Sequence, residues 1–485
     1  MNVIKMDGNP RKTMLFGSVS IASMVMLIVG SMVPSLYLNT TPNETLNESN
    51  VLENWNIIVP DDFSTLQDAV DNAKSGDRIF VRSGRYNSGT GFFDNPLIIR
   101  TSDITLCGED KNTTVIDGRQ RSTVIYIYAD SVTIQGFTIK NNGLNSSLLS
   151  VHSSHNIIEN NIFKTHDVYD GIEYGVRFFN AHDNLFSYNH VSDGEHGIDL
   201  LNADDNIFSY NLVENTDYAI DVDDILTINF SRPSTDKIYR KPCCNNQFIG
   251  NIIQNNMMGI TLSVSPDNLF LNNTFISNNK NGLTLTSCTN NKIKNNKFID
   301  DGLGLFGSEI DHYIHDIEGN LVNDKPLYYM YDQRDFDVPS DAGQIILVDC
   351  NYVSIEEVII SNTSTAVLVV FSEHVYIKNC EFSSNTRGVY LYFSTRCSIE
   401  KNNFIDNRRN AYFINLGLRN SRSNTWSRNY WENILDLKVK LFRPLREKIH
   451  GRFILKKTIR LYKGPQLGIR TRNIDRYPAR YPYEI

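Results

Sequence analysis

A pattern with a period of about 22 residues recurs along most of this 485-residue chain and limits the folds open to it. Each copy reads asparagine, any residue, an apolar residue, two variable residues, asparagine, any residue and an apolar residue. The third residue of each copy is called the anchor here, and we expect it to point inward. The anchors are Ile158, Phe186, Phe208, Phe248, Phe270, Ile293, Ile377, Ile399 and Trp426.

The spacing of the anchors and the alternation around them predict β-structure. Phe186 and Phe208 lie 22 residues apart, and Phe270 and Ile293 lie 23 apart. Apolar and polar residues alternate within each copy, which is the period of strands rather than helices. Helical repeats have longer periods, and leucine-rich repeats need runs of leucine that this chain lacks. The sequence therefore predicts an all-β fold, a right-handed single-stranded parallel β-helix with three short strands in each coil.

One asparagine of each copy is predicted to share a turn position with its counterparts in neighbouring coils. Asparagine tolerates the left-handed backbone conformation that such a turn needs, and stacked amides can hydrogen-bond from coil to coil. The asparagines of this turn are Asn161, Asn189, Asn211, Asn251, Asn273, Asn296 and Asn402.

A hydrophobic segment near the N-terminus predicts a membrane anchor. Residues 13–38 carry no charged side chain, and a helix needs roughly 20 apolar residues to cross a bilayer. Lys5, Arg11 and Lys12 precede the segment, whereas the next basic residue is Lys74. This asymmetry predicts a cytoplasmic N-terminus and a body on the outer face of the cell membrane. A cleaved signal peptide is the alternative, but the length of the segment favours a retained anchor.

The limits of the repeat define the other regions. Apolar residues at helical spacing in 62–75 predict a helix that covers the open end of the coils. Phe208 and Phe248 lie 40 residues apart, so the segment near Ile225–Asn245 is predicted to be a loop over one face. The predicted regions are a cytoplasmic N-terminus at 1–12, a transmembrane anchor or signal segment at 13–38, a glycosylated linker at 39–54, the β-helix at 55–431 and a basic C-terminal cap or tail at 432–485.

N-x-S/T sequons support an extracytoplasmic body. Three of them crowd into the linker directly after the predicted membrane exit, which suggests a glycosylated stalk. The sequons begin at Asn39, Asn43, Asn47, Asn112, Asn145, Asn229, Asn272 and Asn362.

The charge distribution argues against nucleic acid as a partner. The net charge of the chain is −8, and residues 437–485 carry 14 Lys and Arg against 3 Asp and Glu, a balance of +11. The rest of the chain therefore carries −8 − 11 = −19, which does not suit a phosphate backbone. The basic tail is expected to be a packed or solvated end-cap, with contact to anionic lipid as the alternative. The odd number of cysteines, seven, and the lack of a C-x-x-C motif argue against a disulfide framework or a structural zinc site.

Several segments resemble known β-helix families. Residues Asp61–Tyr86 look like the entry segment of pectinesterase-like β-helices, and the repeat resembles NosD-like and CASH-domain proteins of the pectin-lyase-like superfamily. Val322–Gln333, Asp341–Cys350 and Arg476–Ile485 look like segments of NosD-like surface proteins of archaea. The resemblance covers roughly residues 57–485. It implies the fold, and for the NosD family it implies a role in copper-site assembly in a nitrous oxide reductase. No complete pectinesterase or polygalacturonase pattern is present, and fold alone does not carry function.

Charged residues in successive coils form the candidate site. Arg177, Asp199 and Asp221 are predicted to point outward in one column, and Asp223 lies two residues further on the same face. Tyr174, His196 and Tyr218 precede these strands. Two carboxylates could act as acid and nucleophile on a glycosidic bond, three could hold Ca²⁺, and tyrosines with carboxylates could bind a glycan. A solvated acidic face is the plain alternative.

Histidines are dense between positions 152 and 196, which would suit a copper or zinc site. They occupy different columns of the predicted coil, so scattered surface positions are the better interpretation. We therefore expect a membrane-anchored extracytoplasmic β-helix that binds carbohydrate or another envelope polymer. The alternatives are a polysaccharide lyase or hydrolase, a NosD-like copper-site accessory protein and a structural envelope component.

Overall fold

The computed structural model describes residues 54–87, 96–165, 172–223, 225–228, 238–416, 423–432, 447–454, 468–475, 478–479 and 481–485. The chain divides into two compact units, Met1–Asn54 and Trp55–Ile485, and the second contains the coils. The predicted membrane segment and the linker sequons lie outside the described residues. Within the described ranges, no helix is long and apolar enough to cross a membrane, so the membrane anchor at residues 13–38 stays a prediction.

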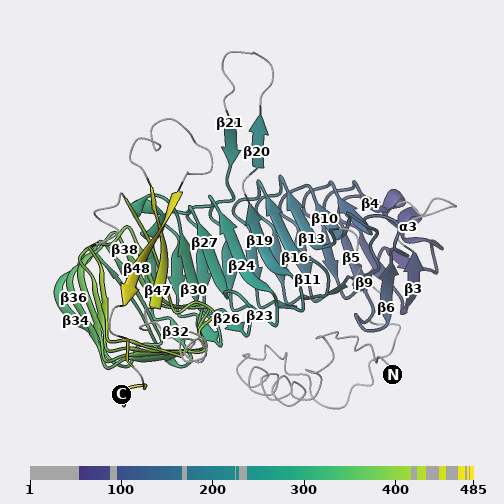
Figure 1. Ribbon diagram of the computed structural model, residues 1–485. Coiled ribbons are helices and arrows are strands. Elements are labelled where there is room, and N and C mark those ends of the chain that lie inside the picture. Colours follow the sequence, from purple (N-terminus) through teal and green to yellow (C-terminus); the bar gives the residue numbers. More distant parts are fainter. Residues whose placement is uncertain are drawn as a thin grey trace, which may run out of the picture. The chain divides into compact units, whose positions relative to one another are not determined.

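The second unit begins with a stack of coils whose strands form three parallel sheets (Figure 1). The predicted parallel β-helix with three strands in each coil is confirmed. The first sheet contains β1 (Ile57–Val59), β2 (Arg78–Val81), β5 (Thr105–Gly108), β8 (Thr133–Gln135), β11 (Ile157–Glu159), β14 (Leu185–Ser187), β17 (Ile207–Ser209), β22 (Gln247–Ile249), β25 (Leu269–Leu271), β28 (Lys292–Lys294) and β31 (Asp316–Glu318).

The other two sheets follow the first in every coil. The second sheet contains β3 (Gly84–Asn87), β6 (Thr114–Asp117), β9 (Thr138–Lys140), β12 (Ile162–Lys164), β15 (His190–Ser192), β18 (Leu212–Glu214), β23 (Ile252–Gln254), β26 (Thr274–Ile276), β29 (Lys297–Ile299) and β32 (Leu321–Val322). The third sheet contains β4 (Leu97–Ile99), β7 (Ile125–Ile127), β10 (Ser147–Val151), β13 (Tyr174–Phe179), β16 (His196–Leu201), β19 (Tyr218–Asp223), β24 (Met258–Ser263), β27 (Leu283–Thr286) and β30 (Leu303–Phe306).

The predicted anchors form one interior column. Phe186, Phe208, Phe248, Phe270 and Ile293 are paired in register through five successive coils, and all five are fully buried. The rings of Phe248 and Phe270 stack with centroids 5.0 Å apart. Full burial of such a side chain contributes about 1.5–3 kcal/mol, so the repeat of apolar anchors stabilises the coils.

The predicted asparagine stack is also present. The backbone N–H of Asn211 donates to the Oδ1 of Asn251, and that of Asn251 donates to the Oδ1 of Asn273, both at 2.9 Å. The left-handed conformation belongs to the residue before the asparagine, such as Tyr210 at φ 54°, and not to the asparagine itself. The prediction was wrong on this detail because the buried amide needs regular geometry to reach the next coil.

A short helix covers the N-terminal end, as predicted. The helix α3 (Leu66–Asn72) is capped by Thr65, whose side chain accepts a hydrogen bond from the backbone of Asp68. Leu66, Ala69 and Val70 are buried and belong to the core of the first coils. The helix therefore closes an edge that would otherwise expose apolar side chains.

The regular stack is interrupted after β32. The chain reverses there, and β32 pairs antiparallel with β33; the short 3-10 helix η1 (Ile310–Tyr313) lies just before this point. The following coils form a second stack of three sheets. The fourth sheet contains β34 (Arg334–Val338), β36 (Asn351–Glu356), β39 (Glu373–Lys378), β42 (Ser398–Glu400) and β45 (Thr425–Ser427).

The fifth sheet contains β37 (Ile359–Ser361), β40 (Glu381–Ser383), β43 (Asn403–Ile405) and β46 (Tyr430–Trp431). The sixth sheet contains β33 (Lys325–Tyr331), β35 (Gln344–Val348), β38 (Thr365–Val370), β41 (Arg387–Tyr392), β44 (Ala411–Leu416), β47 (Glu447–Ile454) and β48 (Gly468–Asp475). The sixth sheet is buried on both faces: Ile345 packs into the core of the second stack, whereas Ile346 packs against the first stack. This double burial explains the continuous apolar runs of β35 and β38.

A hairpin projects from the coils after β19. The segment predicted as an irregular loop contains an antiparallel hairpin of β20 (Ile225–Ile228) and β21 (Ile238–Lys241), and these strands stand out from the coils in Figure 1. At the C-terminal end, Asp475 accepts hydrogen bonds from the backbone and side chain of Asn429 and from the indole of Trp431. Most of the predicted cap at 432–485 lies outside the described residues, so the cap stays a prediction.

Candidate functional site

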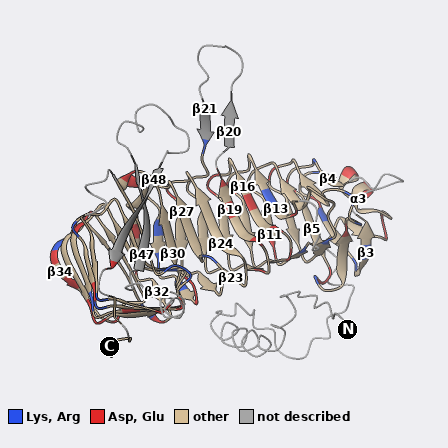
Figure 2. Ribbon diagram, viewed as in Figure 1, with Lys and Arg blue, Asp and Glu red and all other residues tan. Residues whose placement is uncertain are grey.

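Three neighbouring strands of the third sheet carry the predicted charged column. The register of β13, β16 and β19 aligns Arg177 with Asp199 and Asp199 with Asp221. The next coil continues the column with Thr261. Figure 2 shows a basic position on β13 and acidic positions on β16 and β19. The side chains alternate in and out along each strand, so a regular register is enough to bring this column onto one outer face.

Each charge in the column has a close neighbour. Arg177 Nε donates to Asp199 Oδ2 at 2.8 Å, and the guanidinium lies 4.1 Å from the centroid of the Tyr174 ring. Thr261 donates its hydroxyl hydrogen to Asp221. The predicted column is therefore a connected polar network and not a set of separate solvated charges.

The first residues of these three strands form an aromatic ladder beside this network. Tyr174, His196 and Tyr218 are in register, and their rings stack with centroid distances of 5.0 Å and 4.9 Å. All three side chains are half-buried. Because the rings stack on one another, the ladder forms one continuous aromatic strip of half-buried side chains, against which an apolar part of a sugar can pack.

The first carboxylate of the column is strongly shielded from water. The Asp199 side chain is 7% exposed, and this burial raises the pKa of Asp199, although the nearby Arg177 guanidinium opposes the rise. The shielding argues against Asp199 as a nucleophile, because a sugar ring cannot approach a carboxylate that is covered and already bonded to arginine. The geometry therefore suits binding better than glycosidic bond cleavage.

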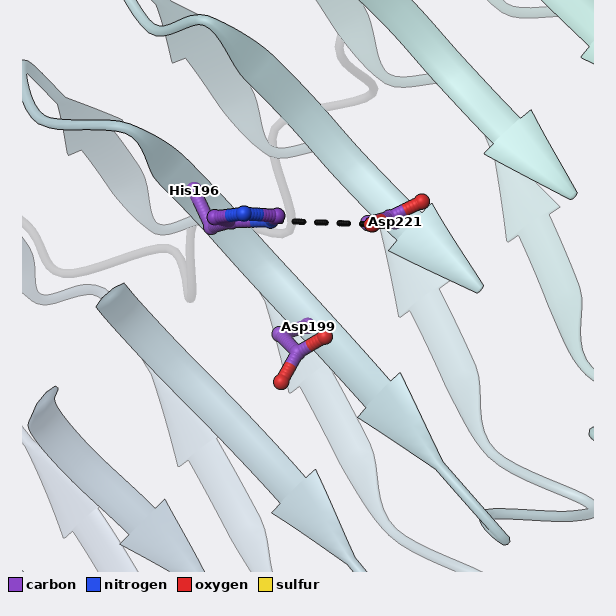
Figure 3. A group of neighbouring side chains, drawn as sticks. All are labelled: His196, Asp199 and Asp221. Carbon is purple, nitrogen blue, oxygen red and sulfur yellow. Dashed lines mark ion pairs between the residues drawn. The ribbon is translucent and has the colours of Figure 1, made fainter. Parts of the chain in front are cut away.

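His196 joins the two carboxylates in a group of possible metal ligands (Figure 3). One ligand atom from each of His196, Asp199 and Asp221 lies within 4.8 Å of the other two. The Nδ1 atom of His196 is buried without a hydrogen-bond partner and lies 3.6 Å from Asp221 Oδ2. The donor set of one imidazole and two carboxylates fits a transition metal such as Cu²⁺ or Zn²⁺. It supplies too few oxygens for Ca²⁺, which takes six to eight.

Asp223 does not belong to this group. In the register of β16 and β19 it lies opposite Leu201, one column away from Asp199 and Asp221. Asp223 thus has the expected place two residues beyond Asp221, and the ligand atoms that come within 4.8 Å of one another are those of His196, Asp199 and Asp221. The spacing of the repeat places His196 next to the column, whereas the direction of its ring depends on the packing of the folded coils.

A second group of aromatic side chains extends the face on the N-terminal side, and sequence reasoning missed it. The rings of Tyr126 and Tyr128 stack at 5.5 Å, and His152 lies 5.0 Å from Tyr128 and 5.6 Å from Phe179. Burial, with Arg177 nearby, lowers the pKa of His152. The signal was the run of alternating tyrosines in strand β7, which lacks the asparagine pattern of the later coils.

Other predicted residues lie apart from this face. His182 pairs with Asp204, and His190 pairs with Glu214, so the described histidines contact different partners as expected, and His166 lies outside the described residues. The sequon asparagines Asn112, Asn145, Asn272 and Asn362 are exposed, and Asn229 lies outside the described residues. Exposure permits glycosylation, which stays a prediction.

Comparison with known families supports the fold in two segments. Residues 331–434 match the family model described as "Periplasmic copper-binding protein (NosD)". Residues 108–233 and 224–328 match the model described as "Right handed beta helix region". The NosD match covers the second stack, whereas the group of His196, Asp199 and Asp221 lies in the first. A search of curated protein sequences found no match.

Solved structures with a similar course of the chain have low sequence identity. The catalytic domain of a GH87 α-1,3-glucanase in complex with tetrasaccharides is 13% identical, with a TM-score of 0.41, over 80% of this chain and 70% of that chain. A family 28 exopolygalacturonase of Yersinia enterocolitica is 13% identical, with a TM-score of 0.39, over 72% and 73%. PfbA, a surface adhesin of Streptococcus pneumoniae, is 12% identical, with a TM-score of 0.37, over 74% and 88%. These values are too low to support any inference about activity.

Proposed function

We propose that this NosD-like right-handed β-helix protein binds a glycan on the outer face of β13, β16 and β19. The observation that supports the proposal is the ladder of Tyr174, His196 and Tyr218 beside the network of Arg177, Asp199 and Asp221. Aromatic side chains pack on the apolar side of sugar rings, and the more exposed Asp221 and Arg177 can bond to hydroxyl groups, with Asp199 holding Arg177 in place.

The polar network is organised before the ligand arrives. Arg177 is fixed between Tyr174 and Asp199, and Asp221 is fixed by Thr261. Fixed side chains lose little entropy when a ligand binds. A structural column in a sheet would more naturally consist of Thr, Ser or Asn, since like charges in neighbouring strands repel; the pair of Asp199 and Asp221 is therefore best explained by binding.

The proposal includes an extracytoplasmic location on the membrane. The apolar segment at 13–38 and the basic residues before it support a single span with the coils outside. In that position the glycan would be a component of the envelope or of the surroundings of the cell. The exposed sequons of the coils agree with such a location.

The test is a binding panel with the full-length protein. Neutral and acidic polysaccharides are offered to the parent protein, to Tyr218→Ala, and to Asp221→Asn, which removes a charge but keeps the shape. We expect both variants to lose most of the affinity that the parent shows. Tyr376→Ala is the matched control, because Tyr376 is an exposed tyrosine on the fourth sheet. Equal binding by the parent and both site variants would remove this face from the proposal.

A second candidate function is the binding of a transition metal by His196, Asp199 and Asp221. It is favoured by the buried Nδ1 of His196, which has no hydrogen-bond partner, and by the carboxylates beside it. The family that residues 331–434 match is described as copper-binding, although these residues do not include His196, Asp199 or Asp221. Calorimetry with Cu²⁺, Zn²⁺ and Ca²⁺ on the parent and on His196→Asn distinguishes the two functions. Glycan binding without any metal binding would exclude the second candidate.

A further inference from the structure

Two arginines of the second stack occupy neighbouring positions in one column. Arg387 follows Thr365 in the register of β38 and β41. Val389 pairs with Ala411, and the backbone N–H of Gly388 bonds to the carbonyl of Arg409, so Arg409 takes the next place after Arg387. Neighbouring strands are about 4.8 Å apart. Like charges in such positions repel and destabilise a sheet.

Aromatic rings flank both guanidinium groups. Arg387 lies over Phe306 and Tyr390, with distances of 5.4 Å and 5.8 Å from its guanidinium carbon to the ring centroids. Arg409 lies over Tyr412 at 4.7 Å. Tyr390 and Tyr412 are themselves neighbours in register. The result is a two-by-two arrangement of arginine and tyrosine on adjacent coils, with Phe306 from the first stack at its edge.

The carboxylates whose side chains the structure describes do not balance the positive charge of this arrangement. Among the side chains that the structure describes, no Asp or Glu forms an ion pair with Arg387 or Arg409. Arg387 is half-buried, and its one hydrogen bond to another side chain goes from Nη1 to the Thr365 hydroxyl at 3.4 Å. Burial lowers the pKa of Arg387, and Arg409 and Arg408 add to this through their like charge. A partly buried cation without a counter-ion is costly for the fold.

The order of charged and aromatic residues around Gly388 differs from the order around Gly197 in the first stack. The residue before Gly197 is aromatic (His196), whereas the residue before Gly388 is Arg387. Two positions after these glycines, the first stack has Asp199 and the second has Tyr390. The charged and the aromatic residue therefore exchange places between the two stacks, and the charge changes from acidic at Asp199 to basic at Arg387.

We propose that Arg387 and Arg409 form a site for an oxyanion carried on a saccharide, either a carboxylate or a sulfate ester. Guanidinium groups bind such anions through paired hydrogen bonds. One anion placed between the two arginines would relieve their repulsion and supply the missing counter-charge. Tyr412, which is half-buried, gives the sugar ring of the same ligand an aromatic surface, and the buried Tyr390 supports Arg387 from below. The site is separate from the face of the first stack and does not depend on glycan binding there.

The test measures anion binding by the full-length protein and by Arg387→Met. The probes are an oligomer of uronic acid, a sulfated glycan and an uncharged glucan, compared by calorimetry at equal ionic strength. We expect the parent to bind at least one of the two charged probes and not the glucan, and Arg387→Met to bind about tenfold more weakly or not at all. The carboxylate and sulfate arms identify which group the site prefers.

The melting temperature shows whether Arg387→Met is still folded. Without ligand, Arg387→Met is expected to melt at a higher temperature than the parent, because it removes an unpaired and partly buried charge. Arg409→Gln, at an exposed position, should weaken anion binding without changing the fold. Arg396→Met is the matched control, since Arg396 is exposed and already paired with Glu373 at 2.8 Å; its anion binding should equal that of the parent.

Glu447 is the first residue of β47. Because Tyr412 pairs with His450, Glu447 lies in register with Arg409, one coil further along the same column. Glu447→Gln should therefore keep or strengthen anion binding. The proposal is overturned if the parent binds neither charged probe, if Arg387→Met and Arg409→Gln bind as the parent does, or if Glu447→Gln abolishes binding. Loss of binding at this site with intact glycan binding by the first stack, or the reverse, separates this inference from the function proposed above.

Discussion

Asp301 accepts hydrogen bonds at one carboxylate oxygen from both the backbone N–H and the side-chain amide of Asn278, at 3.1 Å and 2.7 Å. It occupies the place that an asparagine holds in the preceding coils, at the end of the first stack. Thr363 of the second stack donates its hydroxyl hydrogen to the carbonyl of Asp301 at 2.9 Å. A carboxyl group is thus buried where the two stacks meet, beside a polar cavity of about 280 Å³.

Replacing Asp301 with asparagine should change the pH dependence of stability. Burial raises the pKa of Asp301 from 3.8 to about 7, so the folded protein holds a proton that the unfolded chain releases. The stability linked to this group is present below pH 3.8 and is lost as the pH rises through about 7. The free energy of unfolding of Asp301→Asn, relative to the parent, should therefore increase by a few kcal/mol between about pH 5 and 8.

Urea denaturation at several pH values measures this effect. Asp300→Asn is the control, because Asp300 is the exposed neighbour of Asp301 in the same turn. A constant difference between Asp301→Asn and the parent across the pH range would show that Asp301 is ionised in the folded protein at all these values.

Truncating an anchor should destabilise the first stack strongly. Phe248 is fully buried between Phe208 and Phe270, and a buried phenylalanine changed to alanine typically costs about 3–5 kcal/mol. Phe248→Ala should lower the denaturation midpoint accordingly. Tyr352→Ala, at an exposed position, is expected to change the free energy of unfolding by about 0.5 kcal/mol or less. Equal effects of the two variants would contradict the column of anchors.

Removing one amide from the asparagine stack should cost less than removing an anchor but more than a surface change. Asn251 accepts from Asn211 and donates to Asn273 and to the carbonyl of Phe208. Asn251→Ala leaves several buried groups unpaired, at about 1–3 kcal/mol for such a group. Hydrogen exchange should show faster exchange for the backbone N–H of Asn211. Asn272→Gly, in the exposed left-handed position of the next coil, should leave that N–H protected.

The contacts of Asp475 predict a weak point at the C-terminal end. Its carboxylate accepts from Asn429 and from the indole of Trp431, so Asp475→Ala leaves buried donors without these bonds. We expect limited proteolysis to remove the C-terminal residues from this variant much faster than from the parent. Asp475→Asn, which keeps one acceptor oxygen, should lie between the two. Equal proteolysis of all three proteins would show that other contacts hold the end of the chain.

The orientation predicted from residues 13–38 is tested on intact cells. Protease added outside should digest or release the coils and spare a tag placed before residue 1. A protected body with an accessible tag would reverse the orientation, because the charge asymmetry around the segment is the basis of the assignment. Permeabilised cells, in which both sides are accessible, provide the control.

The sequence alone determined the coils, the identity of the inward anchors and the helix at the N-terminal end. This was possible because the information is local: strand alternation and a constant spacing place Phe186 over Phe208 without knowledge of any other contact. The outward column of Arg177, Asp199 and Asp221 followed from the same counting. Between 293 and 377 the weaker pattern gave only the presence of further coils, since their apolar runs lack alternation.

Only the tertiary structure decided which side chains meet across coils and stacks. The ring of His196 turns toward Asp221, because side-chain directions depend on packing. The reversal at β32 brings Thr363 to Asp301 and Phe306 to Arg387. These contacts join residues far apart in the sequence. Burial at the contacts raises the pKa of Asp301 and lowers the pKa of Arg387. No repeat pattern encodes such a contact, because it forms once, where the repeat is broken.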